Sequence, residues 1–143
     1  MSSVADILSG KGGDVIQIDG DATVFDAVKA MVEANVGALL VTDNDEVVGI
    51  FTERDYLRRI AVEGRRSRAT LVHEVMSAPV ICVTPETGID ESMALMTDRR
   101  IRHAPVIDGG KLVGMVSIGD LVKFQTQQQS FEIKYLKDYI TAR

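Results

Sequence analysis

The sequence contains one pattern twice, and this internal repeat constrains the fold more than any other feature. Residues 15–57 align with residues 80–122 without a gap, and identical pairs include Val15/Val80, Gly49/Gly114 and Asp55/Asp120. A repeat of this length is a supersecondary unit, and neighbouring copies usually bury a face against each other. We therefore expect two equivalent units that pack about a pseudo-twofold axis, with paired surface clefts at their junction.

Composition narrows the possible classes of protein. The chain of 143 residues has 45% apolar and 26% charged residues, which is ordinary for a soluble globular protein. Its net charge of −5 argues against a general nucleic-acid binder. The apolar runs are too short to span a bilayer, and no secretory signal is recognisable. A cytoplasmic protein is expected, and the single Cys82, in an apolar run, is predicted to be buried.

Each copy is predicted to form a β-α-β-β-α unit. In the first copy, Thr23 and Asp26 form a capping-box pattern that starts a helix. Tight hairpin turns are predicted at residues 43–46 and 108–110. The expected elements are strands 15–18, 38–42 and 47–51 and helices 23–32 and 53–62 in the first copy, then strands 80–83, 104–107 and 112–116 and helices 89–99 and from 118 in the second.

Similar lead-in segments precede the two copies, at residues 4–8 and 72–76. The predicted domains are therefore 1–70, the first repeat with its lead-in and a polar connector, and 71–143, the second repeat with a C-terminal amphipathic helix. The segment Gly10–Gly13 lacks the P-loop frame and is expected to be a mobile loop. The C-terminal apolar residues with helical spacing either cover the protein's own core or form a dimer contact: Phe131, Tyr135, Leu136, Tyr139 and Ile140.

The third strand of each copy ends in the motif Gly-x-x-(Thr/Ser)-x-x-Asp, at residues 49–55 and 114–120. Thr52 with Asp55, and Ser117 with Asp120, are good N-capping pairs for the helix that follows. The same carboxylate can accept the hydroxyl groups of a ribose, as acidic residues do in dinucleotide folds. The two interpretations are compatible, because a capping carboxylate can still present its second oxygen to a ligand.

These motifs, the two lead-ins and the segment 102–108 (Arg-His-Ala-Pro-Val-Ile-Asp) together resemble the cystathionine-β-synthase (CBS) domain pair, or Bateman module. The resemblance covers almost the whole chain and is greatest to stand-alone, single-pair proteins. It implies an α+β fold: a tandem CBS-domain pair of two β-α-β-β-α repeats related by a pseudo-twofold axis.

The resemblance further implies that an adenosine nucleotide binds in the clefts between the copies. Asp55 and Asp120 would hold ribose, with Thr52 and Ser117 beside them. The other implied nucleotide-binding residues are Arg102, His103 and Pro105. Arg54 is a further candidate, because a net-negative protein needs local positive charge to hold the phosphates. Because Gly37 and Ala38 stand in the first copy where the second has Arg102 and His103, one cleft is expected to dominate. AMP is the first expectation, with ADP, ATP and NAD as alternatives.

The expected function is a non-catalytic regulatory module that reports nucleotide occupancy to a partner protein, in a homodimer with Tyr135 and Tyr139 near the interface. Two alternatives remain open: an interaction or dimerisation scaffold whose nucleotide clefts are vestigial, and an enzyme that processes a nucleotide or NAD. The sequence offers no recognisable nucleophile. Its only histidine and cysteine residues are His73, His103 and Cys82, which are too few to make a zinc site expected.

Overall fold

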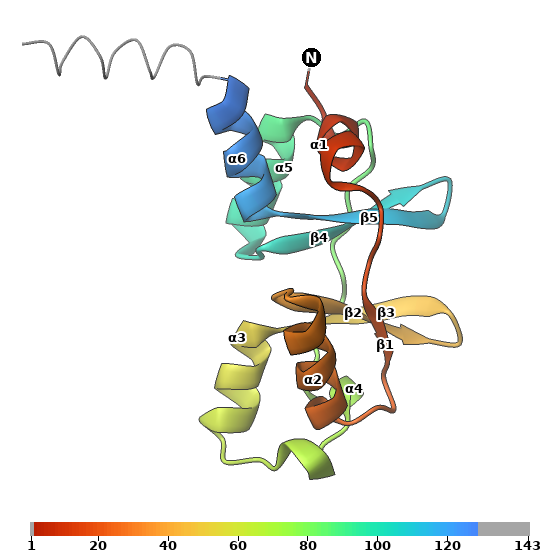
Figure 1. The fold of residues 1–143 in the computed structure, drawn as a ribbon, viewed down its shortest axis with the longest axis vertical. Coiled ribbons are helices and arrows are strands. Elements are labelled where there is room, and N and C mark those ends of the chain that lie inside the picture. The colour runs from red at the N-terminus through yellow and green to blue at the C-terminus, as the bar shows by residue number, and fades with distance from the viewer. Residues whose placement is uncertain (1, 129–143) are drawn as a thin grey trace, which may run out of the picture. The chain divides into compact units, whose positions relative to one another are not determined.

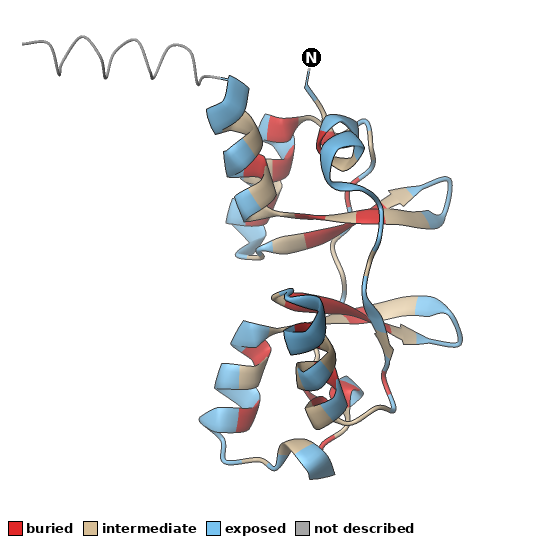
Figure 2. Ribbon diagram, viewed as in Figure 1, coloured by how far each residue is buried: buried red, intermediate tan, exposed pale blue. Residues whose placement is uncertain are grey.

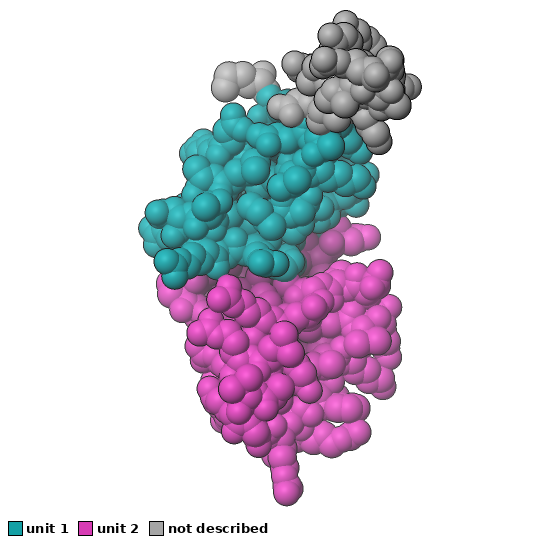
Figure 3. Space-filling model, turned by 90° about the vertical axis from the view of Figure 1, so that its left-hand side faces the viewer, with its two compact units in different colours: residues 1–13, 83–143 teal, residues 14–82 magenta. Residues whose placement is uncertain are grey.

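The computed structural model describes residues 2–128, which fall into two compact units (Figure 3). Of the described residues, 14–82 form the first-repeat unit, and 2–13 together with 83–128 form the second-repeat unit. The boundary predicted at residue 70 follows the sequence repeat, whereas the structure exchanges the two lead-ins. Helix α1 (Val4–Lys11) belongs to the second-repeat unit, and α4 (Val72–Val75) belongs to the first-repeat unit.

The first-repeat unit contains a three-stranded sheet in the order β1-β2-β3 (Figure 1). Strand β1 (Gln17–Asp19) is parallel to β2 (Ala38–Asp43), which is antiparallel to β3 (Glu46–Thr52). The helices are α2 (Val24–Ala34), α3 (Glu53–Tyr56) with its π-helical continuation η1 (Leu57–Ala61), the 3₁₀ turn η2 (Ser67–Ala69) and α4. The predicted β-α-β-β-α order is confirmed for this repeat.

The second-repeat unit is built on an antiparallel hairpin of β4 (His103–Asp108) and β5 (Lys111–Ser117). Helices α5 (Ile89–Arg99) and α6 (Ile118–Gln128) belong to this unit, and α1 packs on β5 and α6 (Figure 1). Both helices begin where the sequence predicted. The C-terminal residues from Phe131 to Ile140 lie outside the described part of the chain.

The predicted strand 80–83 is wrong. Only Val83 pairs with the hairpin, as one isolated bridge to Val106. Its N–H donates to Pro105 O at 3.0 Å, and its carbonyl accepts from Ile107 N at 2.9 Å. An apolar run indicates burial, but a strand also needs a ladder of partner groups, and here the ladder is one residue long.

Both hairpin turns follow their sequence signals. Asn44 and Asp45 have φ values of 51° and 66°, and Gly109 and Gly110 have 58° and 80°. Two consecutive left-handed residues match the right-handed twist of the flanking strands. Asn, Asp and Gly tolerate this conformation better than other residues, which is why the turns could be read from the sequence.

Each unit buries its own core, and the exchanged lead-in helix is part of it (Figure 2). Val4 and Ile7 of α1 are buried with Met96, Val116 and Leu121. In the first-repeat unit, the corresponding core comprises Val24, Ala27, Met31, Leu39, Val41, Phe51, Ile60, Val72 and Val75. The apolar faces of α1 and α4 would be exposed to water if these helices did not pack in these cores. Burial of apolar surface, and not proximity along the chain, therefore decides which repeat each lead-in joins.

The cysteine departs from its sequence prediction, since Cys82 is exposed instead of buried. Helix α2 begins as predicted, with the Thr23 hydroxyl accepting from Asp26 N at 3.1 Å. No helix within residues 2–128 is long and apolar enough to cross a membrane.

Candidate functional site

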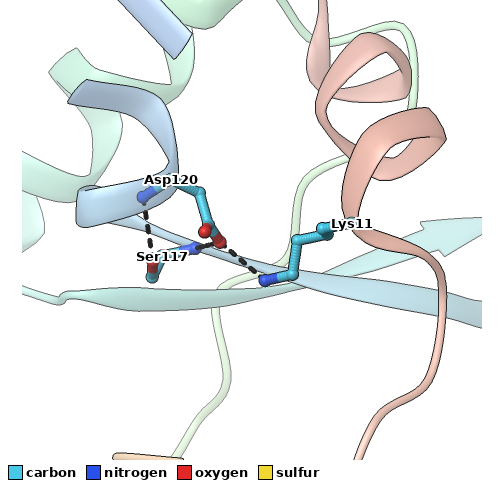
Figure 4. A network of polar contacts seen from close by, with 3 residues as sticks. All are labelled: Lys11, Ser117 and Asp120. Atoms are coloured by element: carbon cyan, nitrogen blue, oxygen red, sulfur yellow. Dashed lines mark hydrogen bonds and ion pairs between the residues drawn. The ribbon is translucent and has the colours of Figure 1, made fainter. Parts of the chain in front are cut away.

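The two Gly-x-x-(Thr/Ser)-x-x-Asp motifs form matching capping boxes where β3 meets α3 and where β5 meets α6. In the first, Thr52 N donates to Asp55 Oδ2 at 3.0 Å and Asp55 N donates to Thr52 Oγ1 at 3.2 Å. In the second, Ser117 N donates to Asp120 Oδ2 at 2.8 Å and Asp120 N donates to Ser117 Oγ at 3.0 Å (Figure 4). The capping interpretation of both motifs is therefore confirmed.

The first residue of each motif is a glycine, and its lack of a side chain leaves room for the exchanged lead-in to pack against the strand. A Cβ atom on Gly114 would lie 2.7 Å from Leu8 Cδ2, and one on Gly49 would collide with Met76 Sδ and lie 3.0 Å from Ser77 O. The motif thus joins two tasks, close packing of a lead-in and capping of a helix. The sequence carried a signal for this packing, because both lead-ins end in a long apolar residue, Leu8 or Met76.

Both carboxylate oxygens of Asp55 accept hydrogen bonds from groups of its own unit. Its Oδ1 accepts from Ser77 Oγ at 2.8 Å, while Oδ2 accepts from Thr52 N and from Thr52 Oγ1 at 3.1 Å. The residue is only 8% exposed. Both oxygens are satisfied, as a buried carboxylate requires, so Asp55 stabilises the first-repeat unit in the observed state.

The carboxylate of Asp120 is half open. Its Oδ2 accepts from Ser117 N and from Lys11 Nζ, the latter at 2.6 Å (Figure 4). Within residues 2–128 no group donates a hydrogen bond to its Oδ1, and the side chain is 25% exposed. The two junctions therefore share a backbone design but differ in the acceptor capacity left for a ligand.

The charge of Asp120 is favoured by its surroundings. Burial alone would raise the pKa of this carboxyl group, but the hydrogen bond and positive charge of Lys11 and the hydrogen bonds from Ser117 outweigh that effect. The net result is a pKa below the ordinary value for aspartate. Asp120 is consequently an anionic acceptor at neutral pH.

The basic pair predicted to meet phosphate lies beside this second junction. His103 is opposite Ser117 across the β4–β5 hairpin, and Ile118 N donates to Arg102 O at 2.9 Å. Arg102 is exposed and makes no ion pair within residues 2–128. Pro105 is buried further along β4, opposite Met115. The structure thus gathers Arg102, His103, Ser117 and Asp120 at one end of one hairpin.

The first junction lacks this basic character. Glu53 N donates to Gly37 O at 3.1 Å, and the Glu53 carboxylate lies 3.1 Å from where a Gly37 Cβ would be. Glu53 therefore occupies space beside the position that corresponds to Arg102. Arg54, in the first turn of α3, is exposed. The two junctions therefore differ in local charge as well as in the hydrogen bonds that their acids accept.

Lys11 is a polar partner that the sequence prediction missed. The segment Gly10–Gly13 was expected to be a mobile loop. In the structure Gly10 and Lys11 form the end of α1, and of this segment only Gly12 and Gly13 lie outside the helix. Because 109 residues separate Lys11 from Asp120, no local pattern could have joined them. Within residues 2–128, no group of three or more His, Cys, Asp or Glu side chains could hold a metal ion.

Comparison with known proteins establishes the family. The model of the CBS domain matches twice, over residues 4–62 and 72–126, and together the matches cover most of the chain. This protein belongs to the CBS domain family and contains a tandem pair. CBS domains are regulatory modules and often bind nucleotides.

Relatives with similar sequences and structures are about one CBS pair long. The chain is 45% identical to the mitochondrial CBS domain-containing protein CBSX3 of Arabidopsis thaliana, over 97% of this chain and 72% of that protein. It is 48% identical to a putative signal-transduction protein with CBS domains from Burkholderia ambifaria, with a TM-score of 0.86 over 90% of this chain and 96% of that one. A hexameric CBS-CP12 protein from bloom-forming cyanobacteria is 32% identical with a TM-score of 0.80, over 99% and 86% of the respective chains. None of these three names describes an enzyme.

Proposed function

We propose that this protein is a regulatory module that binds an adenosine nucleotide at the Asp120 junction and reports its occupancy to a partner protein. The observation that carries this proposal is that the Oδ1 of an anionic Asp120, close to the exposed Arg102, accepts no hydrogen bond within residues 2–128. AMP is the first candidate, with ADP, ATP and NAD as alternatives. Membership of a family of regulatory, often nucleotide-binding modules supports the same assignment.

Each residue of the junction has a task in this proposal. A ribose hydroxyl would donate to Asp120 Oδ1, while Ser117 and the start of α6 hold that carboxylate in place. Arg102 would meet phosphate, because a guanidinium forms forked, charge-assisted hydrogen bonds with it. His103 and Pro105 lie on the same strand and complete the set.

The first-repeat set of Thr52, Arg54 and Asp55 would be the weaker site. A ribose could reach Asp55 only by replacing the Ser77 hydrogen bond at 2.8 Å, so part of its binding energy would be lost in the exchange. Regulation also requires that the nucleotide bind two shapes of the protein with different affinity, typically by ~1–3 kcal/mol.

Thermal unfolding with saturating nucleotide tests the proposal. A ligand present at about 100 times its dissociation constant should stabilise the folded protein by about 2.7 kcal/mol. Asp120→Asn should abolish the shift with AMP, whereas Asp98→Asn, a change at a side chain that is 81% exposed, should leave it intact. Titration calorimetry with AMP, ADP, ATP and NAD would rank the ligands, and the absence of heat and thermal shift with all of them would refute nucleotide binding.

A second candidate function, assembly, is favoured by an apolar groove on the first-repeat unit. The groove has a volume of about 380 Å³ and lies between α2 and α3. Val32 and Leu57 on its walls are 74% and 58% exposed, and Val62 nearby along the chain is 82% exposed. Exposed apolar surface of this kind is typical of protein–protein contacts.

We propose that this groove belongs to the interface of a homodimer. Leu57→Lys should shift the protein toward monomer in sedimentation velocity, while Lys111→Gln, a change on the β4–β5 hairpin, should leave the mass unchanged. A protein that is monomeric without substitution, or a Leu57→Lys variant of unchanged mass, would contradict this role. A partner that binds equally with and without nucleotide would favour the scaffold alternative.

A further inference from the structure

We infer that Lys11 is a specificity-determining residue of the nucleotide site, and that it makes the Asp120 junction select an anionic sugar phosphate over a neutral nucleoside. This inference rests on the proposed function of the same junction. It is drawn from the pairing of Lys11 and Asp120 and from the hydrogen-bonding capacity that both side chains retain (Figure 4).

The pair offers two complementary groups side by side. An ammonium group has three N–H donors, and Lys11 uses one of them on Asp120 Oδ2. The Lys11 side chain is 40% exposed, and within residues 2–128 its ammonium group makes no other hydrogen bond. Asp120 Oδ1 remains as an acceptor for a hydroxyl. A sugar phosphate carries both a hydroxyl donor and an anion, whereas a nucleoside satisfies only the carboxylate.

The position of Lys11 is held by packing on both sides. Val4 and Ile7 anchor α1 in the core of the second-repeat unit, and Leu8 lies against Gly114. Gly13 passes so close to β5 that a Cβ atom there would lie 2.5 Å from Val113 O. This packing places the backbone of Lys11 within reach of the junction, and its ammonium group lies 2.6 Å from Asp120 Oδ2.

The first junction provides an internal comparison. There the carboxylate receives the neutral hydroxyl of Ser77, which follows the α4 lead-in, instead of a cation. The Ser77 hydroxyl occupies the second oxygen of Asp55 and adds no charge. Lys11 instead shares Oδ2 of Asp120 with Ser117 N, adds a positive charge and does not occupy Oδ1. Arg102, which directly precedes β4, is also exposed, so the second-repeat unit has two cations near the start of α6.

The test compares AMP and adenosine as ligands of the full chain, with adenosine measured by competition against AMP. Lys11→Gln should weaken AMP about tenfold, as expected for loss of a partly exposed charge-assisted hydrogen bond, and change adenosine less than about twofold. Lys11→Arg should retain the preference for AMP. Lys111→Gln removes an equal charge from the hairpin of the same unit and should change neither affinity.

The outcomes separate this inference from the proposed function. If the unmodified protein binds AMP but Lys11→Gln leaves the ratio of AMP to adenosine affinity unchanged, Lys11 serves only to anchor α1 and the inference is wrong. A parallel loss of both affinities would also overturn the inference, since it shows a structural role. If the unmodified protein binds neither AMP nor adenosine, the inference is wrong, and if it also binds none of ADP, ATP and NAD, the proposed function fails with it.

Discussion

At the scale of single residues, the two acids of the repeated motif have the same backbone setting and different chemical freedom. Asp55 and Asp120 both occupy the third position of a capping box. What separates them is the side chain that each exchanged lead-in brings, Ser77 in one unit and Lys11 in the other. One neighbouring side chain therefore decides how much hydrogen-bonding capacity a capping acid keeps.

This difference predicts unequal costs of removing the two acids. Asp55→Ala should lower the free energy of unfolding by about 2–4 kcal/mol, because it removes a helix cap and leaves the Ser77 hydroxyl without its acceptor. Asp120→Ala should cost about 1 kcal/mol, since its ion pair with Lys11 is partly exposed. Urea denaturation of both variants measures the difference, and equal losses would show that Asp55 is not the more deeply integrated residue.

The pKa of Asp120 predicts a pH dependence of stability. Its folded-state pKa is lowered, so its contribution is fully present above the unfolded value of about 3.9 and is lost as pH falls through the folded value. The stability difference between the unmodified protein and Asp120→Asn should therefore be constant near neutrality and shrink below about pH 4. Denaturation series from pH 7 to pH 3 would detect this, and a difference independent of pH would contradict it.

At the scale of elements, α1 is positioned by glycines as much as by apolar burial. Gly114 leaves space for Leu8, and Gly13 lets the chain pass over β5. These glycines permit close approach and do not provide unusual backbone angles, since only Gly12 in this segment has a positive φ, at 88°. The lead-in and the hairpin therefore depend on each other for their packing.

Two neighbouring glycines provide a matched test of this packing. Gly13→Ala should destabilise the protein by about 1–3 kcal/mol, because the Val113 carbonyl that it meets belongs to the backbone and cannot turn aside. Gly10→Ala lies within α1, where the added methyl group meets no atom within 4 Å beyond its chain neighbours and the backbone of its own helix, and it should stabilise by up to about 1 kcal/mol. Thermal melting of the two variants checks the opposite signs, and two shifts of the same sign would contradict the packing described.

At the scale of the whole molecule, the two repeats are interleaved along the chain. The chain starts in the second-repeat unit, builds the first-repeat unit from residues 14–82 and returns at Val83. The first-repeat unit is thus one continuous segment. The second-repeat unit needs both ends of the described chain, so its core closes only after contacts of large sequence separation have formed.

Interleaving predicts that a mutation near the N-terminus weakens the second repeat. Ile7→Ala should cost about 2–5 kcal/mol by leaving a cavity beside Val116 and Leu121. Hydrogen exchange should accelerate more in β4 and β5 than in β2 and β3. Val75→Ala is the matched variant in α4 and should produce the reverse pattern, whereas greater exchange in β2 and β3 after Ile7→Ala would contradict the assignment of α1.

The sequence by itself determined most of the helices and strands, both hairpin turns and the two capping boxes, because helix caps, hairpin turns and apolar periodicity are local properties of neighbouring residues. Only tertiary structure decided which repeat each lead-in joins, that residues 80–83 lack a strand partner, and that Asp120 retains an open oxygen beside Lys11 whereas Asp55 does not. These features depend on contacts such as Lys11 with Asp120, between residues far apart along the chain. Burial and packing in the folded units determine such contacts, and a local sequence pattern therefore does not predict them.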